Sequence, residues 1–190
     1  MNSATARTST RLWNRPPAEL AHRTQRANDQ QGIERVSKIQ IGRVAPNFKL
    51  AATGGKEIVL KNLRGNNVVI YFYPKDNTSG CTKESCDFKA HHLKFRRRNT
   101  IVLGISRDSQ TSHERFREKF GFPFDLLSDP NEDACKAFDV IREKNMYGRK
   151  VMGIERSTFL IDEKGKLRNE WRKIKVKGHV EEVLDAVKDL

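Results

Sequence analysis

Residues 68–81 read VVIYFYPKDNTSGC, and this stretch decides the fold class. Its first six residues form a continuous apolar run rich in β-branched and aromatic side chains, which is typical of a strand buried on both faces of a sheet. Pro74 ends the run, a polar loop follows, and a helix is expected to open near Cys81. A buried strand that leads through a loop into a helix favours an α/β fold.

The alternation of strands and helices continues along the chain. A second buried strand is predicted over 101–105 and another over 157–161. A tight turn at 162–165 joins the latter to a strand over 167–174, so these two strands pair antiparallel. We therefore predict an α/β fold with a mixed β-sheet flanked by helices. The other expected elements are extended segments at 44–50, 58–60 and 124–127 and helices at 81–98, 109–120, 131–138 and 179–190.

The beginning of the chain differs in composition from the rest. It is rich in Asn, Gln, Arg and Thr, so residues 1–37 are predicted to be a disordered basic N-terminal extension and residues 38–190 one folded domain. The first 18 residues carry arginines and no acid, which leaves organellar targeting open beside the expected cytoplasmic location. No apolar run approaches the ~20 residues that span a bilayer, so no membrane association is expected.

The net charge of +13 lies mostly in the folded domain. Such a surface could attract nucleic acid, and the run KFRRR at 94–98 is its densest part. No fold signature of a nucleic-acid-binding protein accompanies the charge, so nucleic acid is not the expected partner. The run 94–98 closes a helix, where cations complement the helix dipole.

The chain has three cysteines, Cys81, Cys86 and Cys135. A small odd number favours a reducing compartment, where a close pair is more often catalytic or metal-binding than structural. Cys81 falls in the first turn of an expected helix, whose free N–H groups and positive dipole end favour a thiolate. A thiolate can attack the O–O bond of a peroxide. Thr78, the helix N–H groups and Arg156 are the donors expected around the reacting oxygens.

Cys86 follows Cys81 by five residues. In a regular α-helix this spacing places the two Cα atoms about 8–9 Å apart and turns the side chains to different faces. That separation exceeds the ~7 Å limit for a disulfide. A bond between the two sulfurs therefore requires the first turns of the helix to unwind.

Several stretches occur together in the order found in one known family. They read YFYPKDNTSGCTKESC (71–86), VLGISRDS (102–109), LLSDP (126–130) and GIERSTFLID (153–162). In these stretches the chain resembles the peroxiredoxins, and it most resembles the peroxiredoxin Q, or bacterioferritin comigratory protein, subfamily. The resemblance extends over roughly residues 38–190.

The resemblance implies a thioredoxin-like fold and an atypical two-cysteine peroxidase that reduces hydrogen peroxide and organic hydroperoxides. Cys81 would be the peroxidatic cysteine that becomes a sulfenic acid, and Cys86 the resolving cysteine that closes an intramolecular disulfide. Pro74 would shape and shield the pocket, while Thr78 and Arg156 would bind the peroxide oxygens and stabilise the thiolate. The resemblance also implies thioredoxin or a similar dithiol as the reductant, a monomer, and no cofactor or metal.

Two residues depart from the family pattern. Ser79 stands where members usually have proline, so the loop before the helix is expected to be less rigid and the rate to differ. Ile141 stands where many relatives carry tryptophan, which is expected to alter the surface on the reductant-binding side.

A metal site and other thiol chemistry are the alternatives. Cys81, Cys86, His91 and His92 have a tolerable zinc spacing, but on a helix they point in three directions. A general dithiol–disulfide oxidoreductase usually has a C-x-x-C motif, which is absent here.

Two further residues have more than one interpretation. Cys135 is expected to pack as a small apolar residue on a short helix, with a resolving role as its alternative. Glu84 lies in the first turn of the helix that carries Cys81. Its charge is expected to stabilise the N-terminal end of that helix, and a role in proton transfer is the alternative.

Overall fold

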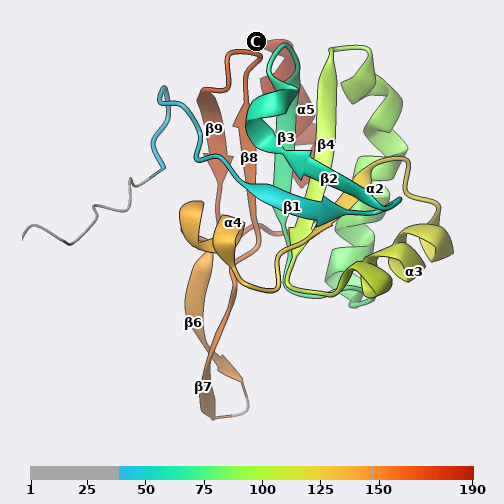
Figure 1. Ribbon diagram of the computed structural model, residues 1–190, viewed down its shortest axis with the longest axis vertical. Helices are drawn as coiled ribbons and strands as arrows, with labels where there is room; N and C mark the ends of the chain where they lie inside the picture. Colours follow the sequence, from blue (N-terminus) through green and yellow to red (C-terminus); the bar gives the residue numbers. More distant parts are fainter. Residues whose placement is uncertain (1–38, 147) are drawn as a thin grey trace, which may run out of the picture. The chain divides into compact units, whose positions relative to one another are not determined.

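The computed structural model describes residues 39–146 and 148–190 (Figure 1). The predicted extension over 1–37 lies outside these residues. In the described part, seven strands form one sheet in the order β2-β1-β5-β4-β3-β8-β9. Their bounds are β1 Lys49–Ala52, β2 Lys56–Val59, β3 Asn67–Phe72, β4 Thr100–Ser106, β5 Asp125–Ser128, β8 Ser157–Ile161 and β9 Leu167–Trp171.

The sheet is mixed, as predicted. Strands β3, β4 and β5 run parallel to one another, whereas β8 pairs antiparallel with both β3 and β9. On the far side, β1 pairs antiparallel with β2 and β5. The described helices are η1 Leu60–Leu63, α2 Ser79–Arg96, α3 Gln110–Phe120, α4 Asp133–Ala137 and α5 His179–Lys188. None of them is long and apolar enough to cross a membrane.

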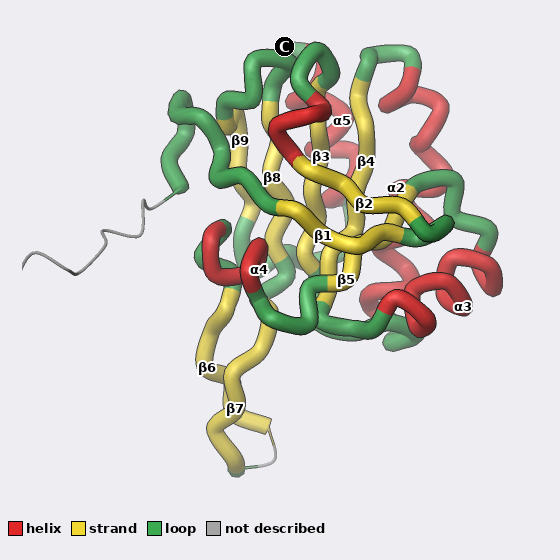
Figure 2. The backbone as a smooth tube through the Cα atoms, viewed as in Figure 1, coloured by secondary structure: helices red, strands yellow, loops and turns green. Residues whose placement is uncertain are grey.

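Strand β3 is buried on both faces, which confirms the prediction from its apolar run. Val68, Ile70 and Phe72 point into one apolar cluster, and the intervening Val69 and Tyr71 point into the other. Figure 2 shows α2 and α5 on one side of the strands and α4 on the opposite side. Helices α2 and α5 contribute side chains to one cluster and α4 to the other, so the strand lies at the centre of a two-sided architecture.

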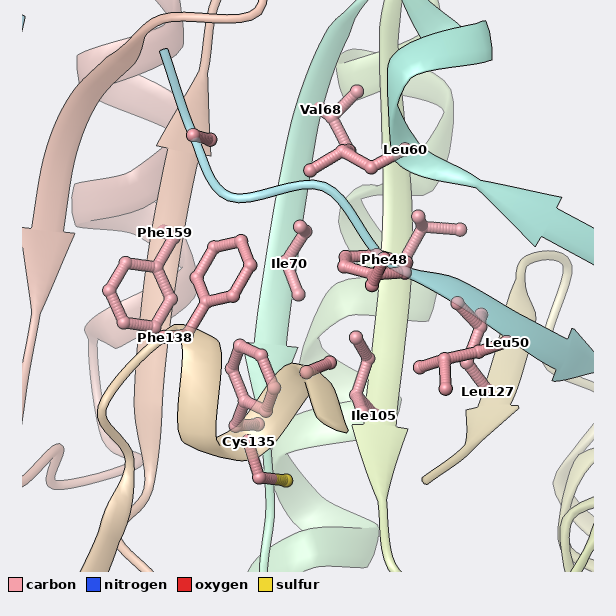
Figure 3. Packing of buried hydrophobic residues seen from close by; sticks show 14 of the residues in the cluster. Phe48, Leu50, Leu60, Val68, Ile70, Ile105, Leu127, Cys135, Phe138 and Phe159 are labelled. Atoms are coloured by element: carbon pink, nitrogen blue, oxygen red, sulfur yellow. The ribbon is translucent and has the colours of Figure 1, made fainter. Parts of the chain in front are cut away.

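The cluster under α4 is closed by aromatic rings. Figure 3 shows Phe138 beside Phe159 of β8, and the two ring centroids lie 5.0 Å apart at an interplanar angle of 70°. Cys135 of α4 points into the same cluster and is fully buried. It is therefore an apolar packing residue, as predicted.

The opposite cluster depends on a glycine in β4. Gly104 lies opposite Tyr71 in the β3–β4 register, and a Cβ added there would come within 2.7 Å of the Tyr71 hydroxyl oxygen. The missing side chain gives the Tyr71 ring its space. That ring stacks on Phe88 of α2, with centroids 4.7 Å apart, so Gly104 indirectly positions the helix that carries Cys81.

A hairpin of two strands was not predicted from the sequence. Strands β6 Ile141–Met146 and β7 Arg149–Ile154 pair antiparallel and form a separate two-stranded sheet. Figure 1 shows this hairpin extending away from the end of the seven-stranded sheet. The hairpin sequence shows no regular alternation of apolar and polar residues. Pairing between the two strands, rather than burial of one face, therefore accounts for the hairpin.

Some predicted boundaries are wrong by a few residues. Helix α2 begins at Ser79 rather than near Cys81 and ends at Arg96, and β9 ends at Trp171 rather than at 174. The first strand begins only at Lys49, because the segment before it makes a single isolated bridge between Val44 and Lys166. Element ends depend on hydrogen-bond partners from distant segments, which a local pattern does not contain.

Candidate active site

The loop from β3 to α2 places a cysteine in the first turn of a helix. Thr78 is the N-cap of α2, with an extended backbone at φ −81° and ψ 150°. Its carbonyl accepts a hydrogen bond from Thr82 N at 2.9 Å, while its hydroxyl donates to the Lys75 carbonyl at 3.2 Å. Cys81 is the third residue of the helix, where backbone N–H groups have no acceptor within the helix. Local geometry thus favours negative charge at the sulfur.

Arg156, the residue immediately before β8, contacts the Cys81 sulfur. Cys81 is only 1% exposed, and Arg156 Nη2 donates to its Sγ at 3.2 Å. Gly80 leaves room for this contact, since a Cβ there would lie 3.3 Å from Arg156 Nη2. Arg156 is 75 residues away in sequence, so the sheet pairing of β3 with β8 is what brings it to Cys81.

The same guanidinium also pairs with a buried acid. Arg156 Nη1 donates to Oε2 of Glu84, which lies one helical turn after Cys81 and is fully buried. Burial raises the pKa of Glu84 to about 7, although the charge of Arg156 and its hydrogen bond oppose the shift. Glu84 Oε1 has no hydrogen-bond partner among the described residues. Arg156 therefore links the Cys81 sulfur to a carboxyl group, Glu84, whose own pKa lies near neutrality.

We expect Glu84 to lower the free energy of unfolding as the pH rises towards neutrality. Its pKa of about 7 in the folded state exceeds the ordinary 4.5, so the folded state binds this proton more tightly than the unfolded state. The stabilisation is fully present below pH 4.5 and is lost as the pH rises through about 7, a change of at most about 3 kcal/mol.

Urea unfolding from about pH 4 to about pH 8 in the wild type and in Glu84→Gln measures this contribution. The glutamine keeps the shape and does not ionise, so it should remove the decline that Glu84 causes. Glu163→Gln, an exposed change, is the matched control and should leave the wild-type decline in place. Parallel curves for the wild type and Glu84→Gln would show that folding does not raise the pKa of Glu84.

The second cysteine of the predicted pair lies on the same intact helix. Cys86 is half-buried at the border of the cluster that contains Cys81, and both are free thiols. Between them, Ser85 Oγ and the buried Tyr71 hydroxyl form a hydrogen bond of 3.0 Å. This bond ties the helix, at the residue before Cys86, to strand β3.

The third cysteine lies on the other face of the sheet. Cys135 belongs to the cluster under α4, whereas Cys81 belongs to the cluster under α2. Burial and the nearby Asp129 raise the pKa of the Cys135 thiol well above its ordinary value. A neutral thiol behind the sheet is poorly placed to resolve an oxidised Cys81.

The zinc interpretation finds no geometric support in the described part of the chain. No group of three or more His, Cys, Asp and Glu side chains there is arranged to hold a metal ion. His91 Nδ1 instead lies 3.0 Å from the Asp87 carbonyl in its own helix. Burial and Arg96 lower the pKa of His92.

The predicted site residues are thus brought together in part. Arg156 contacts Cys81 directly, and Thr78 is the N-cap residue of the helix that carries Cys81, without a side-chain capping bond. Pro74 is half-buried at the start of the same loop. Cys86 remains apart from Cys81 in this helical state.

Sequence reasoning missed several residues around the site. Asp76, Ser112 and His113 form a buried network beside the loop, and Lys144 of β6 interacts electrostatically with Arg156 and Cys81. Burial and the charge of Arg156 lower the pKa of Lys144, whose Nζ donates to the Ile154 carbonyl. One available signal was the i, i+3 spacing of His113 and Phe116, which places the histidine on the buried face of α3.

Comparison with known proteins defines the class. The model of the AhpC/TSA family matches residues 41–170. Peroxiredoxin Bcp of Bacillus subtilis is 47% identical over 152 residues, which cover 80% of this chain and 97% of that protein. Peroxiredoxin Bcp of Xanthomonas campestris is 52% identical over 142 residues, covering 75% of this chain and 89% of that protein.

Solved structures agree with these relatives. Xylella fastidiosa PrxQ superposes with a TM-score of 0.76 at 44% identity, covering 80% of this chain and 98% of that one. Xanthomonas campestris bacterioferritin comigratory protein, described with an alkyl peroxide reduction activity, gives a TM-score of 0.72 at 50% identity over 75% of this chain and 90% of that one. The chain belongs to the AhpC/TSA family of peroxiredoxins and has their thioredoxin-like fold. Within this family it is a thiol-dependent peroxidase of the Bcp/PrxQ kind.

Proposed function

We propose that Cys81 is the peroxidatic cysteine and that Cys86 resolves it. The observation that carries the first assignment is the 3.2 Å contact from Arg156 Nη2 to Cys81 Sγ at the start of α2. The guanidinium and the helix dipole both favour the thiolate. The substrate is hydrogen peroxide or an organic hydroperoxide.

The first step transfers one oxygen to sulfur. The Cys81 thiolate attacks the terminal oxygen of the hydroperoxide, so an S–O bond forms and the O–O bond breaks. The departing alkoxide or hydroxide takes a proton and leaves as alcohol or water, while Cys81 becomes a sulfenic acid. Arg156 and the Thr78 hydroxyl donate to the two oxygens as charge moves between them. Pro74 shields the thiolate from water.

The second step closes a disulfide. The Cys86 thiolate attacks the sulfur of the sulfenic acid, an S–S bond forms, and the S–O bond breaks with release of water. Since both cysteines lie on α2, its first turns unwind for this step. A dithiol reductant of the thioredoxin type then reduces the disulfide, which returns two thiols.

The proposal also covers the domain boundaries, the oligomeric state, the location and the partners of the protein. The family model begins at residue 41, which supports a catalytic domain over 38–190 with residues 1–37 as an appendage. We propose a reducing compartment such as the cytoplasm, because three cysteines, a small and odd number, do not suit a structural disulfide framework. The resemblance to the peroxiredoxin Q subfamily supports a monomer. Nucleic acid is not a proposed partner.

One equivalent of hydrogen peroxide added to the reduced protein tests the assignments, followed by mass mapping of peptides under non-reducing conditions. We expect a rapid, peroxide-dependent link between the peptides that contain Cys81 and Cys86. Oxidised Cys81 joined to Cys135, or joined to nothing, would remove Cys86 from the mechanism. A Cys81 that reacts no faster than a free thiol would remove Cys81 itself.

A further inference from the structure

The loop that carries Thr78 is tied to helix α3 by a buried acid. Asp76 is 5% exposed and its carboxylate accepts hydrogen bonds from Tyr73 Oη at 2.8 Å and Ser112 Oγ at 2.7 Å. His113 Nδ1 lies 3.1 and 3.0 Å from the two carboxylate oxygens. The backbone N–H of Asp76 donates to Asp108 Oδ2 at 2.9 Å. We call these five residues, Tyr73, Asp76, Asp108, Ser112 and His113, the Asp76 clamp.

The hydrogen-bond partners of Asp76 and His113 hold both side chains in place. His113 is fully buried, and its Nε2 faces the Leu127 carbonyl at 3.1 Å, which can only accept a hydrogen bond. Its Nδ1 faces the Asp76 carboxylate, which already accepts from Tyr73 and Ser112. Burial alone would raise the pKa of Asp76, but His113, Ser112 and Tyr73 together lower it below the ordinary value. The Asp76 carboxylate is therefore held from three sides, by Tyr73, Ser112 and the His113 ring.

The clamp acts on the part of the chain that leads to the reacting sulfur. Asp76 comes two residues before Thr78, and the intervening Asn77 adopts a left-handed backbone at φ 57°. Thr78 in turn occupies the N-cap position of α2, where its hydroxyl donates back to the Lys75 carbonyl rather than capping the helix. The loop has little freedom between its anchor and the helix, so a shift of Asp76 moves the Thr78 hydroxyl and the first turn of α2.

We propose that His113 is a positioning residue for the peroxidase reaction. It acts through Asp76 and holds the loop over 75–78 so that the Thr78 hydroxyl and the α2 N–H groups meet the peroxide oxygens around Cys81. This inference rests on the proposed function, because it assumes that Cys81 attacks the peroxide. Among the described hydrogen bonds no α3 side chain reaches Cys81, so His113 would act only through Asp76 and the loop.

Two reactions of Cys81 separate positioning from stability. Reaction with hydrogen peroxide needs the oxygens to be held by the loop, whereas alkylation by iodoacetamide needs only an accessible thiolate. Stopped-flow rates are measured for both reagents in His113→Leu and in Phe116→Leu, well below the unfolding midpoints. Phe116 is fully buried on α3 and packs on Tyr73 without belonging to the clamp, so it is the matched control for lost stability.

We expect His113→Leu to slow the peroxide reaction about 10- to 100-fold while alkylation changes less than about threefold. Phe116→Leu should leave both rates within about threefold of the wild type. Ser112→Ala removes one bond to Asp76 without stranding a buried charge, and it should slow only the peroxide reaction, by a smaller factor. If His113→Leu does not fold, the peroxide and iodoacetamide rates of Ser112→Ala test the proposal in its place.

Three outcomes overturn the inference. Equal slowing of both reactions in His113→Leu would mean that the clamp only supports the thiolate or the fold. A Phe116→Leu protein that loses peroxide reactivity to the same extent would assign the effect to stability. Unchanged peroxide rates in both clamp variants would show that the loop needs no anchor. Failure of the proposed function has a different signature, since the wild-type Cys81 would then itself react with peroxide no faster than a free thiol.

Discussion

Arg156→Lys should slow the reaction of Cys81 with hydrogen peroxide by about 10²- to 10³-fold. The arginine contacts the Cys81 sulfur and Glu84 at the same time through two nitrogens of one rigid plane. A lysine ammonium is a point charge on a flexible stem, and its nearest strong partner would be the Glu84 carboxylate. The sulfur and the peroxide oxygens would then lose their donor although the net charge of the protein is unchanged.

Stopped-flow measurement of peroxide oxidation gives the rate constant for this comparison. Arg172→Lys is the matched control, because Arg172 also makes several hydrogen bonds, to the carbonyls of Asp139 and Phe138 and to Glu170. We expect Arg172→Lys to keep the wild-type rate within about threefold, as charge and donor geometry around Cys81 are retained. Similar losses in the two variants would assign the effect of Arg156 to stability and not to the reacting oxygens.

The features that could be read from the sequence are those that local pattern determines. The apolar run before Pro74 placed β3 and its burial on both faces, and the strand at Ser157–Ile161 was predicted with its observed bounds. The position of Cys81 in the first turn of a helix is likewise a local feature, so it could be predicted from the strand–loop–helix pattern. Arg156 could be chosen as the cation because a buried strand follows it directly.

The features that were missed depend on distant partners. The bond of Arg156 to Glu84 joins residues 72 apart, and that of His113 to Asp76 joins residues 37 apart. Neither pair shares an element, so no periodicity within one helix or strand indicates it. The order of the strands, which brings β8 beside β3, had to be known first.

Gly104 is another residue whose role depends on a partner that is distant in sequence. Gly104 lies inside a buried strand, where glycine weakens a strand and offers no packing. The need for glycine at this position is explained only by the neighbouring strand, because the Tyr71 hydroxyl occupies the space that a side chain would fill. Tyr71 then reaches Ser85 on α2, so a residue in β4 influences the helix that must unwind.

Cys86→Ser should stop turnover with a thioredoxin-type dithiol while leaving the first oxidation of Cys81 within about threefold of the wild-type rate. Disulfide formation requires the first turns of α2 to unwind, which breaks the hydrogen bond of Ser85 to Tyr71 and the ion pair of Glu84 with Arg156. Without a second sulfur, no S–S bond compensates for these losses. The helix therefore stays folded around a sulfenic acid that a protein dithiol reaches poorly.

Hydrogen exchange after one equivalent of peroxide makes the conformational step visible. In the wild type we expect the first hydrogen-bonded amides of α2, from Thr82 onward, to lose protection on oxidation, whereas Cys86→Ser keeps it. Cys135→Ala is the matched cysteine control, because that thiol lies behind the sheet and should leave both turnover and the loss of protection unchanged. An oxidised wild type with a Cys81–Cys86 bond and a fully protected α2 would contradict the helical geometry, since about 8–9 Å separates the two Cα atoms in an intact helix.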